Sequence, residues 1–166
     1  GVDTVDLGIG RDTVNASADS SGVYIYLSSA DASDGDYIEL GSGADTVVLG
    51  DAADTVFAGS GADSIYAGAG DNVIDLGTEA DTVTAGAGAE SGYGAGDAVG
   101  DRYVLGAGAD TVYAGDGADW IDVSGGNSAA DSNFVSAGAG SDTVIGGSGN
   151  DVVLAGSGTD SIVLGA

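Results

Sequence analysis

The sequence predicts an all-β fold, a right-handed parallel β-solenoid with two nine-residue units in each coil and about eight coils. Three observations predict it. A motif recurs every nine residues, each copy contains a glycine-rich turn that ends in an aspartate, and a short β-branched segment follows that aspartate. Glycine adopts backbone angles closed to other residues, and β-branched residues favour strands. Each copy therefore predicts one turn and one strand.

The motif is clearest in residues Leu40–Ala67, which read LGSGADTVV, LGDAADTVF and AGSGADSIY before the next copy begins. We call the residue that ends each turn the key residue. A fixed period of this kind is the sequence signature of a repeat architecture. The key residues are Asp3, Asp12, Asp36, Asp45, Asp54, Asp63, Asn72, Asp81, Glu90, Asp101, Asp110, Asp119, Asn133, Asp142, Asp151 and Asp160.

Three steps between key residues are longer than nine. The gap from Asp12 to Asp36 contains the run VYIYL at Val23–Leu27, which predicts another strand, in a unit keyed near Ser21. The steps that end at Asp101 and Asn133 are also long, and solenoids accommodate such insertions as surface loops. We therefore expect a single domain over residues 1–166 with loop insertions near 16–35, 92–100 and 123–132.

The apolar residues fix which side of each strand faces the core. An apolar side chain lies two residues after almost every key residue, and a second often lies four residues after it, as Val47 and Leu49 do after Asp45. Side chains two apart share one face of a strand. A unit of about one strand and one turn cannot bury that face alone, so we expect successive units to coil, with each unit stacked on the second one after it.

This stacking sorts the key residues into two edges of the solenoid. The first edge carries Asp3, Ser21, Asp45, Asp63, Asp81, Asp101, Asp119, Asp142 and Asp160. The second carries Asp12, Asp36, Asp54, Asn72, Glu90, Asp110, Asn133 and Asp151. From Asp45 onward the first edge contains only aspartate, so we expect it to bind metal more continuously than the second.

The composition excludes several classes of function. Two basic residues stand against 27 acidic ones, for a formal net charge of −25. Nucleic-acid phosphates and anionic lipids repel such a chain, so we expect no nucleic-acid partner, no membrane insertion, and cations as ligands. The absence of Cys and His removes disulfides, thiolate metal sites and the commonest catalytic base. We expect no enzymatic activity. High charge is also typical of disordered chains. Here, however, hydrophobic residues, with alanine counted among them, make up 43% of the chain and fall in register, which favours a repeat fold.

The stacked carboxylates themselves predict a metal. Coiling places neighbouring key residues about 5 Å apart along an edge. Repulsion between two such charges is about 0.8 kcal/mol in bulk water and about 3 kcal/mol at an effective dielectric constant of about 20. A divalent cation between turns would convert this repulsion into attraction, and flexible all-oxygen sites suit calcium better than magnesium. The alternative is that each Asp accepts backbone N–H bonds in its turn, and we expect a mixture of both.

The repeat resembles the nonapeptide of the RTX (repeats-in-toxin) family, G-G-x-G-x-D-x-U-x, where U is a large apolar residue. The core G-x-G-x-D is intact at Gly8–Asp12, Gly41–Asp45, Gly59–Asp63, Gly106–Asp110, Gly115–Asp119, Gly138–Asp142, Gly147–Asp151 and Gly156–Asp160. The chain departs from the family where Leu or Ala replaces the first glycine. The turns at Asp51-Ala-Ala and Thr78-Glu-Ala also lack the second glycine, which weakens the expectation of metal there.

The resemblance implies a β-roll with several calcium ions between stacked turns, held by key carboxylates and turn carbonyls. The implied carboxylate ligands are Asp45, Asp63, Asp81, Asp101, Asp119, Asp142 and Asp160 on the first edge, and Asp12, Asp36, Asp54, Asp110 and Asp151 on the second. The implied carbonyl ligands belong to Gly43, Gly61, Gly108, Gly117, Gly140, Gly149 and Gly158.

The resemblance also implies a secreted, extracellular bacterial protein that leaves the cell unfolded through a type I route and folds on meeting calcium. The chain begins at Gly1 and contains no Met, so we expect it to be a segment of a longer protein. We expect a structural module of a surface-layer lattice or filament that associates with itself. The alternatives are a spacer of a large adhesin, including the ice-binding type, and the calcium-folded repeat region of a secreted protease, lipase or toxin.

Overall fold

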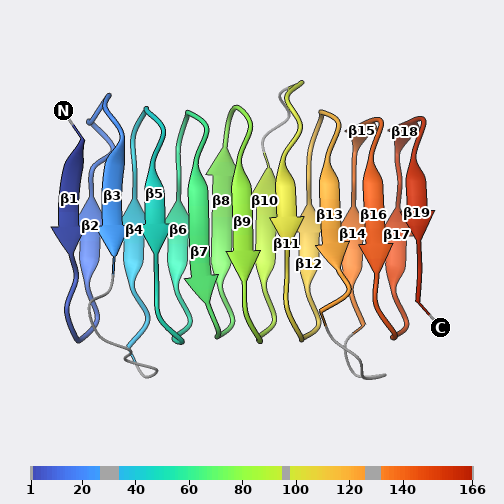
Figure 1. Ribbon diagram of the computed structural model, residues 1–166, viewed down its shortest axis with the longest axis horizontal. Coiled ribbons are helices and arrows are strands. Elements are labelled where there is room, and N and C mark those ends of the chain that lie inside the picture. Colours follow the sequence, from blue (N-terminus) through green and yellow to red (C-terminus); the bar gives the residue numbers. More distant parts are fainter. Residues whose placement is uncertain (1, 27–33, 95–97, 126–131, 166) are drawn as a thin grey trace.

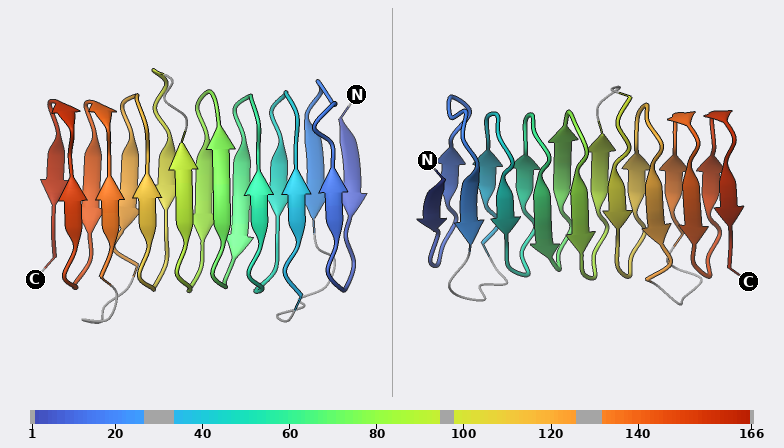
Figure 2. Two further views of the ribbon diagram at one scale, coloured as in Figure 1. Left: turned by 180° about the vertical axis from the view of Figure 1, so that it is seen from behind. Right: turned by 45° about the horizontal axis from the view of Figure 1, so that its top comes forward.

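The computed structural model describes residues 2–26, 34–94, 98–125 and 132–165 (Figure 1). Within these residues the chain forms strands and turns and no helix. Two long sheets run the length of the molecule, and the two ends of the chain lie at opposite ends of the rod (Figures 1 and 2). No described segment forms a helix of the length and apolarity that crossing a membrane requires.

Over the described residues, the first sheet has nine strands and the second has eight. In order, the first contains β1 (Asp3–Asp6), β3 (Val23–Tyr26), β5 (Thr46–Val48), β7 (Ser64–Gly68), β9 (Thr82–Ala85), β11 (Arg102–Val104), β13 (Trp120–Val123), β16 (Thr143–Gly146) and β19 (Ser161–Val163). The second contains β17 (Val152–Leu154), β14 (Phe134–Ser136), β12 (Thr111–Tyr113), β10 (Ser91–Gly94), β8 (Val73–Gly77), β6 (Thr55–Phe57), β4 (Tyr37–Glu39) and β2 (Thr13–Asn15). Two short strands within turns, β15 (Ala139–Gly140) and β18 (Ser157–Gly158), pair with each other.

The chain alternates between the two long sheets, and each strand pairs in parallel with the strand one coil later. Thr46 pairs with Ser64 in the first sheet, and Thr55 pairs with Val73 in the second, so one coil takes 18 residues. The prediction of a parallel β-solenoid with two nine-residue units per coil is confirmed. The predicted insertions near 16–35, 92–100 and 123–132 each include residues outside the described ranges.

One phase assignment from the sequence is wrong. The unit of β3 is not keyed near Ser21, because Val23 pairs with Asp3 and donates its N–H to Asp45 Oδ1 at 2.6 Å. Val23 therefore occupies the key position and Ile25 the first core position. A shift of two residues leaves the same side chains on the buried face, so the apolar alternation is unable to distinguish the two phases.

The core lies between the two sheets and consists of the apolar residues that follow the key residues. Val47, Val56 and Ile65 are each at most 1% exposed. The pattern varies at one coil, where the buried Tyr103 faces Gly92. A Cβ atom added to Gly92 would lie 3.1 Å from Tyr103 Cε1, so the missing side chain leaves room for the large ring.

Candidate calcium-binding turns

The key residues lie immediately before the strands, where they form one row along each edge of the solenoid. The first row consists entirely of aspartate from Asp45 to Asp160, and the second row contains the exceptions Asn72, Glu90 and Asn133. Between Asp36 and Asp142 every key residue is at most 5% exposed. Stacking has therefore removed a series of polar side chains from water.

In both rows, one side-chain oxygen of most Asp and Asn key residues accepts a hydrogen bond from the neighbouring coil. The N–H of Asp45 donates to Asp63 Oδ1 at 2.8 Å, and the N–H of Asp63 donates to Asp81 Oδ1 at the same distance. The second row repeats the contact, since the N–H of Asp54 donates to Asn72 Oδ1 at 3.0 Å. The alternative that Asp accepts backbone N–H bonds is thus correct for one oxygen, although the donor belongs to the preceding coil instead of the same turn.

The second oxygen has no such partner at several positions. Oδ2 of Asp45, Asp54, Asp63 and Asp142 is buried and receives no hydrogen bond. Burial of a polar atom without a partner is costly, and burial of an unpaired charge more so. These four atoms need either a proton or a cation.

The contacts of Asn72 show which groups face the second terminal atom of a key side chain. Its Oδ1 accepts the same N–H bond as an aspartate would, and its Nδ2 donates to the carbonyl oxygen of Gly70 at 3.1 Å and to that of Ala67 at 3.5 Å. The side-chain NH₂ group thus points at two carbonyls of its own turn. Asn133 behaves similarly, with Nδ2 donating to the Val123 carbonyl at 3.2 Å.

Asp63 fills the equivalent position one unit earlier, with its Oδ1 bonded in the same way. Its Oδ2 therefore stands where the Nδ2 of Asn72 stands, and the carbonyls equivalent to those of Gly70 and Ala67 belong to Gly61 and Ala58. An oxygen that faces carbonyl oxygens repels them. A cation at that point would attract all of them, and oxygen ligands of this kind suit calcium.

The glycines bring carbonyls of neighbouring turns close to the same carboxylates. A Cβ atom added to Gly140 would lie 1.5 Å from the Gly117 carbonyl oxygen and 3.1 Å from Asp142 Oδ1, so these two oxygens converge from adjacent coils. Six of the seven implied carbonyl ligands have positive φ, namely Gly43, Gly61, Gly108, Gly117, Gly140 and Gly158. Gly149 is not among them.

The turn at Thr78-Glu-Ala retains this conformation without the glycine. Glu79, at the position equivalent to Gly61, has a φ of 85°. Within the described residues, no three acidic side chains come close enough to form a metal site by themselves. Any ion here would therefore depend on turn carbonyls as well as on the key carboxylates.

Burial also changes the acidity of the key carboxylates. It raises the pKa of Asp63 to about 7 and that of Asp54 to about 6, and it raises the pKa of Asp45 and Asp142 as well. Glu90 is the extreme case, since burial and the neighbouring Asp110 raise its pKa to about 9. Burial therefore makes these carboxyl groups harder to ionise in the absence of a cation.

The repeat pattern does not predict the hydrogen bonds from one coil to the key side chains of the next, nor the contacts of Asn72 and Asn133 with the carbonyls of Ala67 and Val123. The available signal was the replacement of Asp by Asn at two key positions, because the amide retains one acceptor oxygen and replaces the other oxygen with a donor. The predicted glycine carbonyls and carboxylates do come from the same turns. Their roles as calcium ligands stay predictions.

The fold and these turns define a class of protein, a repeat solenoid whose stacked turns present rows of oxygen atoms suited to a hard cation. A family model for the RTX calcium-binding nonapeptide repeat (4 copies) matches residues 32–65, 48–83, 66–99, 95–128 and 129–162. The chain belongs to this family of RTX calcium-binding repeats. Comparison with curated proteins and comparison with solved structures found no match.

Proposed function

We propose that this chain is a calcium-dependent structural module of a secreted bacterial surface protein, which folds and assembles when it meets extracellular calcium. The observation that carries the proposal is the difference between Asp63 and Asn72. The amide of Asn72 satisfies its turn carbonyls directly, whereas Asp63 presents a buried oxygen without a hydrogen bond at the equivalent point.

The proposed ligands are the key aspartates together with the carbonyls of the turn glycines. The first edge binds calcium more continuously than the second, because Asn72 and Asn133 carry their own donor and no charge. The role is structural and involves no catalytic step. Weak sites, with dissociation constants of about 10⁻⁴–10⁻³ M as in extracellular modules, make folding respond to the move from the cell interior to the calcium outside.

Assembly into a lattice or filament depends on how far bound calcium reduces the negative charge of the chain. A molecule with a net charge of −25 repels its own copies until bound cations reduce that charge. Tyr24 and Tyr66 on the outer face of the first sheet are 39% and 48% exposed and offer apolar contact area. Self-association is therefore expected only with calcium.

Circular dichroism during calcium titration tests the folding part of this proposal, and sedimentation velocity tests the assembly part. We expect β-structure to increase over about 0.1–1 mM calcium and to be lost after chelation, with magnesium at equal concentration much less effective. Unchanged β-structure in the metal-free protein would contradict calcium-dependent folding. A monomer at all calcium concentrations would contradict assembly and leave the folding result intact.

A further inference from the structure

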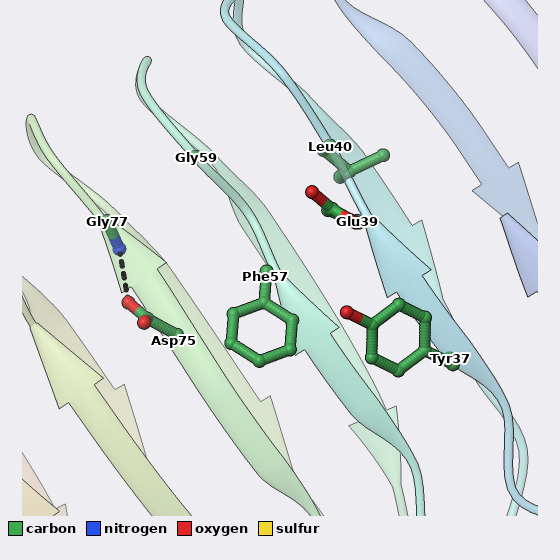
Figure 3. A pocket seen from close by; sticks show the side chains of 7 residues that line it. All are labelled: Tyr37, Glu39, Leu40, Phe57, Gly59, Asp75 and Gly77. Atoms are coloured by element: carbon green, nitrogen blue, oxygen red, sulfur yellow. Dashed lines mark hydrogen bonds between the residues drawn. The ribbon is translucent and has the colours of Figure 1, made fainter. Parts of the chain in front are cut away.

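A groove on the outer face of the second sheet lies apart from the key carboxylates. Its volume is about 450 Å³, and its walls include Tyr37 and Glu39 of β4, Phe57 of β6 and Asp75 of β8 (Figure 3). Tyr37 is 40% exposed and Phe57 is 36% exposed. The groove thus combines accessible aromatic rings with acidic side chains.

The register of the sheet arranges these side chains in a row. Glu39 pairs with Phe57 and Phe57 pairs with Asp75, so the ring lies between two carboxylates (Figure 3). The ring of Tyr37 lies 5.8 Å from that of Phe57, at an interplanar angle of 50°. The backbones of Glu39 and Asp75 are two strand spacings apart, about 10 Å. Because the Phe57 ring lies between them, the two carboxylates are poorly placed to share one metal ion.

Both carboxylates are anchored without a positive charge. Glu39 Oε2 accepts a hydrogen bond from Asn15 Nδ2 at 3.1 Å, and Asp75 Oδ1 accepts one from the N–H of Gly77 at 3.2 Å. An amide and a peptide N–H supply these bonds, so the negative charges at the groove are not neutralised by them. A cationic ligand would meet accessible aromatic rings and carboxylates that each already accept one hydrogen bond.

The chain itself contains an arginine–aromatic pair on its other face. Arg102 Cζ lies 4.3 Å from the centroid of the Trp120 ring, across adjacent strands of the first sheet. The other basic residue, Arg11, lies just before β2. The groove residue Leu40 follows β4, so it lies at the opposite end of these parallel strands from Arg11. The groove has aromatic rings and carboxylates, which an arginine side chain contacts, but its lining includes neither arginine of this chain.

We propose that this groove binds an arginine side chain of a basic partner protein. A guanidinium group stacks on aromatic faces and pairs with carboxylates, and the groove supplies both within one row. Glu39 and Asp75 belong to neither row of key residues, so calcium bound in the turns leaves these two charges to attract a basic side chain. A neutral oligosaccharide would use the rings without the charge, and it is the competing occupant that the experiment distinguishes.

The test is an NMR titration of the full chain in saturating calcium with the peptide acetyl-Gly-Arg-Gly-amide. The same peptide with citrulline, a neutral isostere of arginine, and a neutral glucan tetrasaccharide are titrated in parallel. We expect the arginine peptide to shift resonances of Tyr37 and Phe57, and the other two probes to leave them unchanged. Phe57→Leu and Asp75→Asn should each weaken binding about three-fold, which is typical of exposed cation–π contacts and ion pairs.

The matched control is Asp122→Asn on the first sheet. Asp122 Oδ1 accepts the N–H of Ser124 at 3.0 Å, just as Asp75 Oδ1 accepts that of Gly77, and both substitutions remove one charge while retaining the acceptor. Asp122→Asn should leave binding unchanged. Equal effects of Asp75→Asn and Asp122→Asn would reveal general attraction to an acidic surface and overturn the proposal. So would equal binding of the citrulline peptide, or shifts produced by the tetrasaccharide alone. Circular dichroism confirms that each variant is folded.

Discussion

Asp63 and Asn72 fill equivalent key positions and differ in one atom at the end of the side chain. Both accept an N–H bond from the preceding coil. Asn72 then donates to the carbonyls of its own turn, whereas the second oxygen of Asp63 is buried without a hydrogen bond. The identity of this atom decides whether a turn satisfies itself or needs a cation.

The substitution Asn72→Asp should therefore create a calcium site, and Asp63→Asn should remove one. Asn at position 63 keeps the bond from Asp45 and removes a buried charge, so we expect the metal-free protein to be no less stable. Isothermal titration calorimetry should show one ion more for Asn72→Asp and one ion fewer for Asp63→Asn. Unchanged stoichiometry in both variants would argue against the assignment. Asp63→Ala also loses the acceptor oxygen, so it should lower the free energy of unfolding in saturating calcium more than Asp63→Asn does.

The glycine at position 61 is required by the approach of the next turn. Its φ is 129°, and an added Cβ would lie 2.1 Å from the Gly43 carbonyl oxygen. We expect Gly61→Ala to lower the free energy of unfolding in calcium by about 1–3 kcal/mol, the cost of a strained backbone residue, measured by denaturant unfolding. Gly8→Ala is the control, because Gly8 also has positive φ but no atom within 4 Å of the added Cβ. Equal losses in both variants would mean that the close approach is unimportant.

The sequence predicts the key residues well because a nine-residue period repeats along almost the whole chain. It does not predict which atom holds each carboxylate, since the donor to Asp63 is the N–H of Asp45, 18 residues away, and that contact exists only after stacking. The phase of β3 is missed for a related reason. Val23 and Ile25 are buried in either phase, and only pairing with β1 and β5 fixes Val23 at the key position.

At the level of elements, each edge of the solenoid is a row of acids whose ionisation depends on the stacking of the strands. Burial raises the pKa of Asp63 to about 7 and that of Asp54 to about 6, from a usual value of 3.8. A carboxyl whose pKa is higher in the folded state than in the unfolded state contributes stability at low pH. That stability is complete below about pH 4 and is lost as the pH rises through 6 and 7.

We therefore expect the metal-free protein to be more stable at pH 5 than at pH 8, and calcium to bind more tightly at pH 8, where the carboxylates are ionised. Circular dichroism of the metal-free protein at the two values, which measures how much β-structure remains, and calcium titrations at both values test these opposite trends. Asp63→Asn should reduce the pH dependence of the metal-free protein. A metal-free protein that gains stability as the pH rises would contradict the account of buried carboxylates.

At the scale of the whole molecule, two parallel sheets enclose an apolar core while the turns concentrate charge along both edges. The coiling and the two-sheet arrangement follow from the period and the alternation of apolar residues, and the structure confirms them. The outer groove at Tyr37, Phe57 and Asp75 was not predictable, because its residues come from three coils and meet only through strand register. The excess of acidic residues links the two proposals, since the carboxylates in the turns need cations and those at the groove attract a basic side chain.

The most direct measurement is a crystal structure of this chain grown with calcium, with anomalous scattering used to place the ions. The account predicts ions beside the second carboxylate oxygens of Asp45, Asp63 and Asp142, coordinated also by turn carbonyls, and no ion in the turns that end at Asn72 and Asn133. Key aspartates bonded only to peptide N–H groups and water in that structure would contradict it.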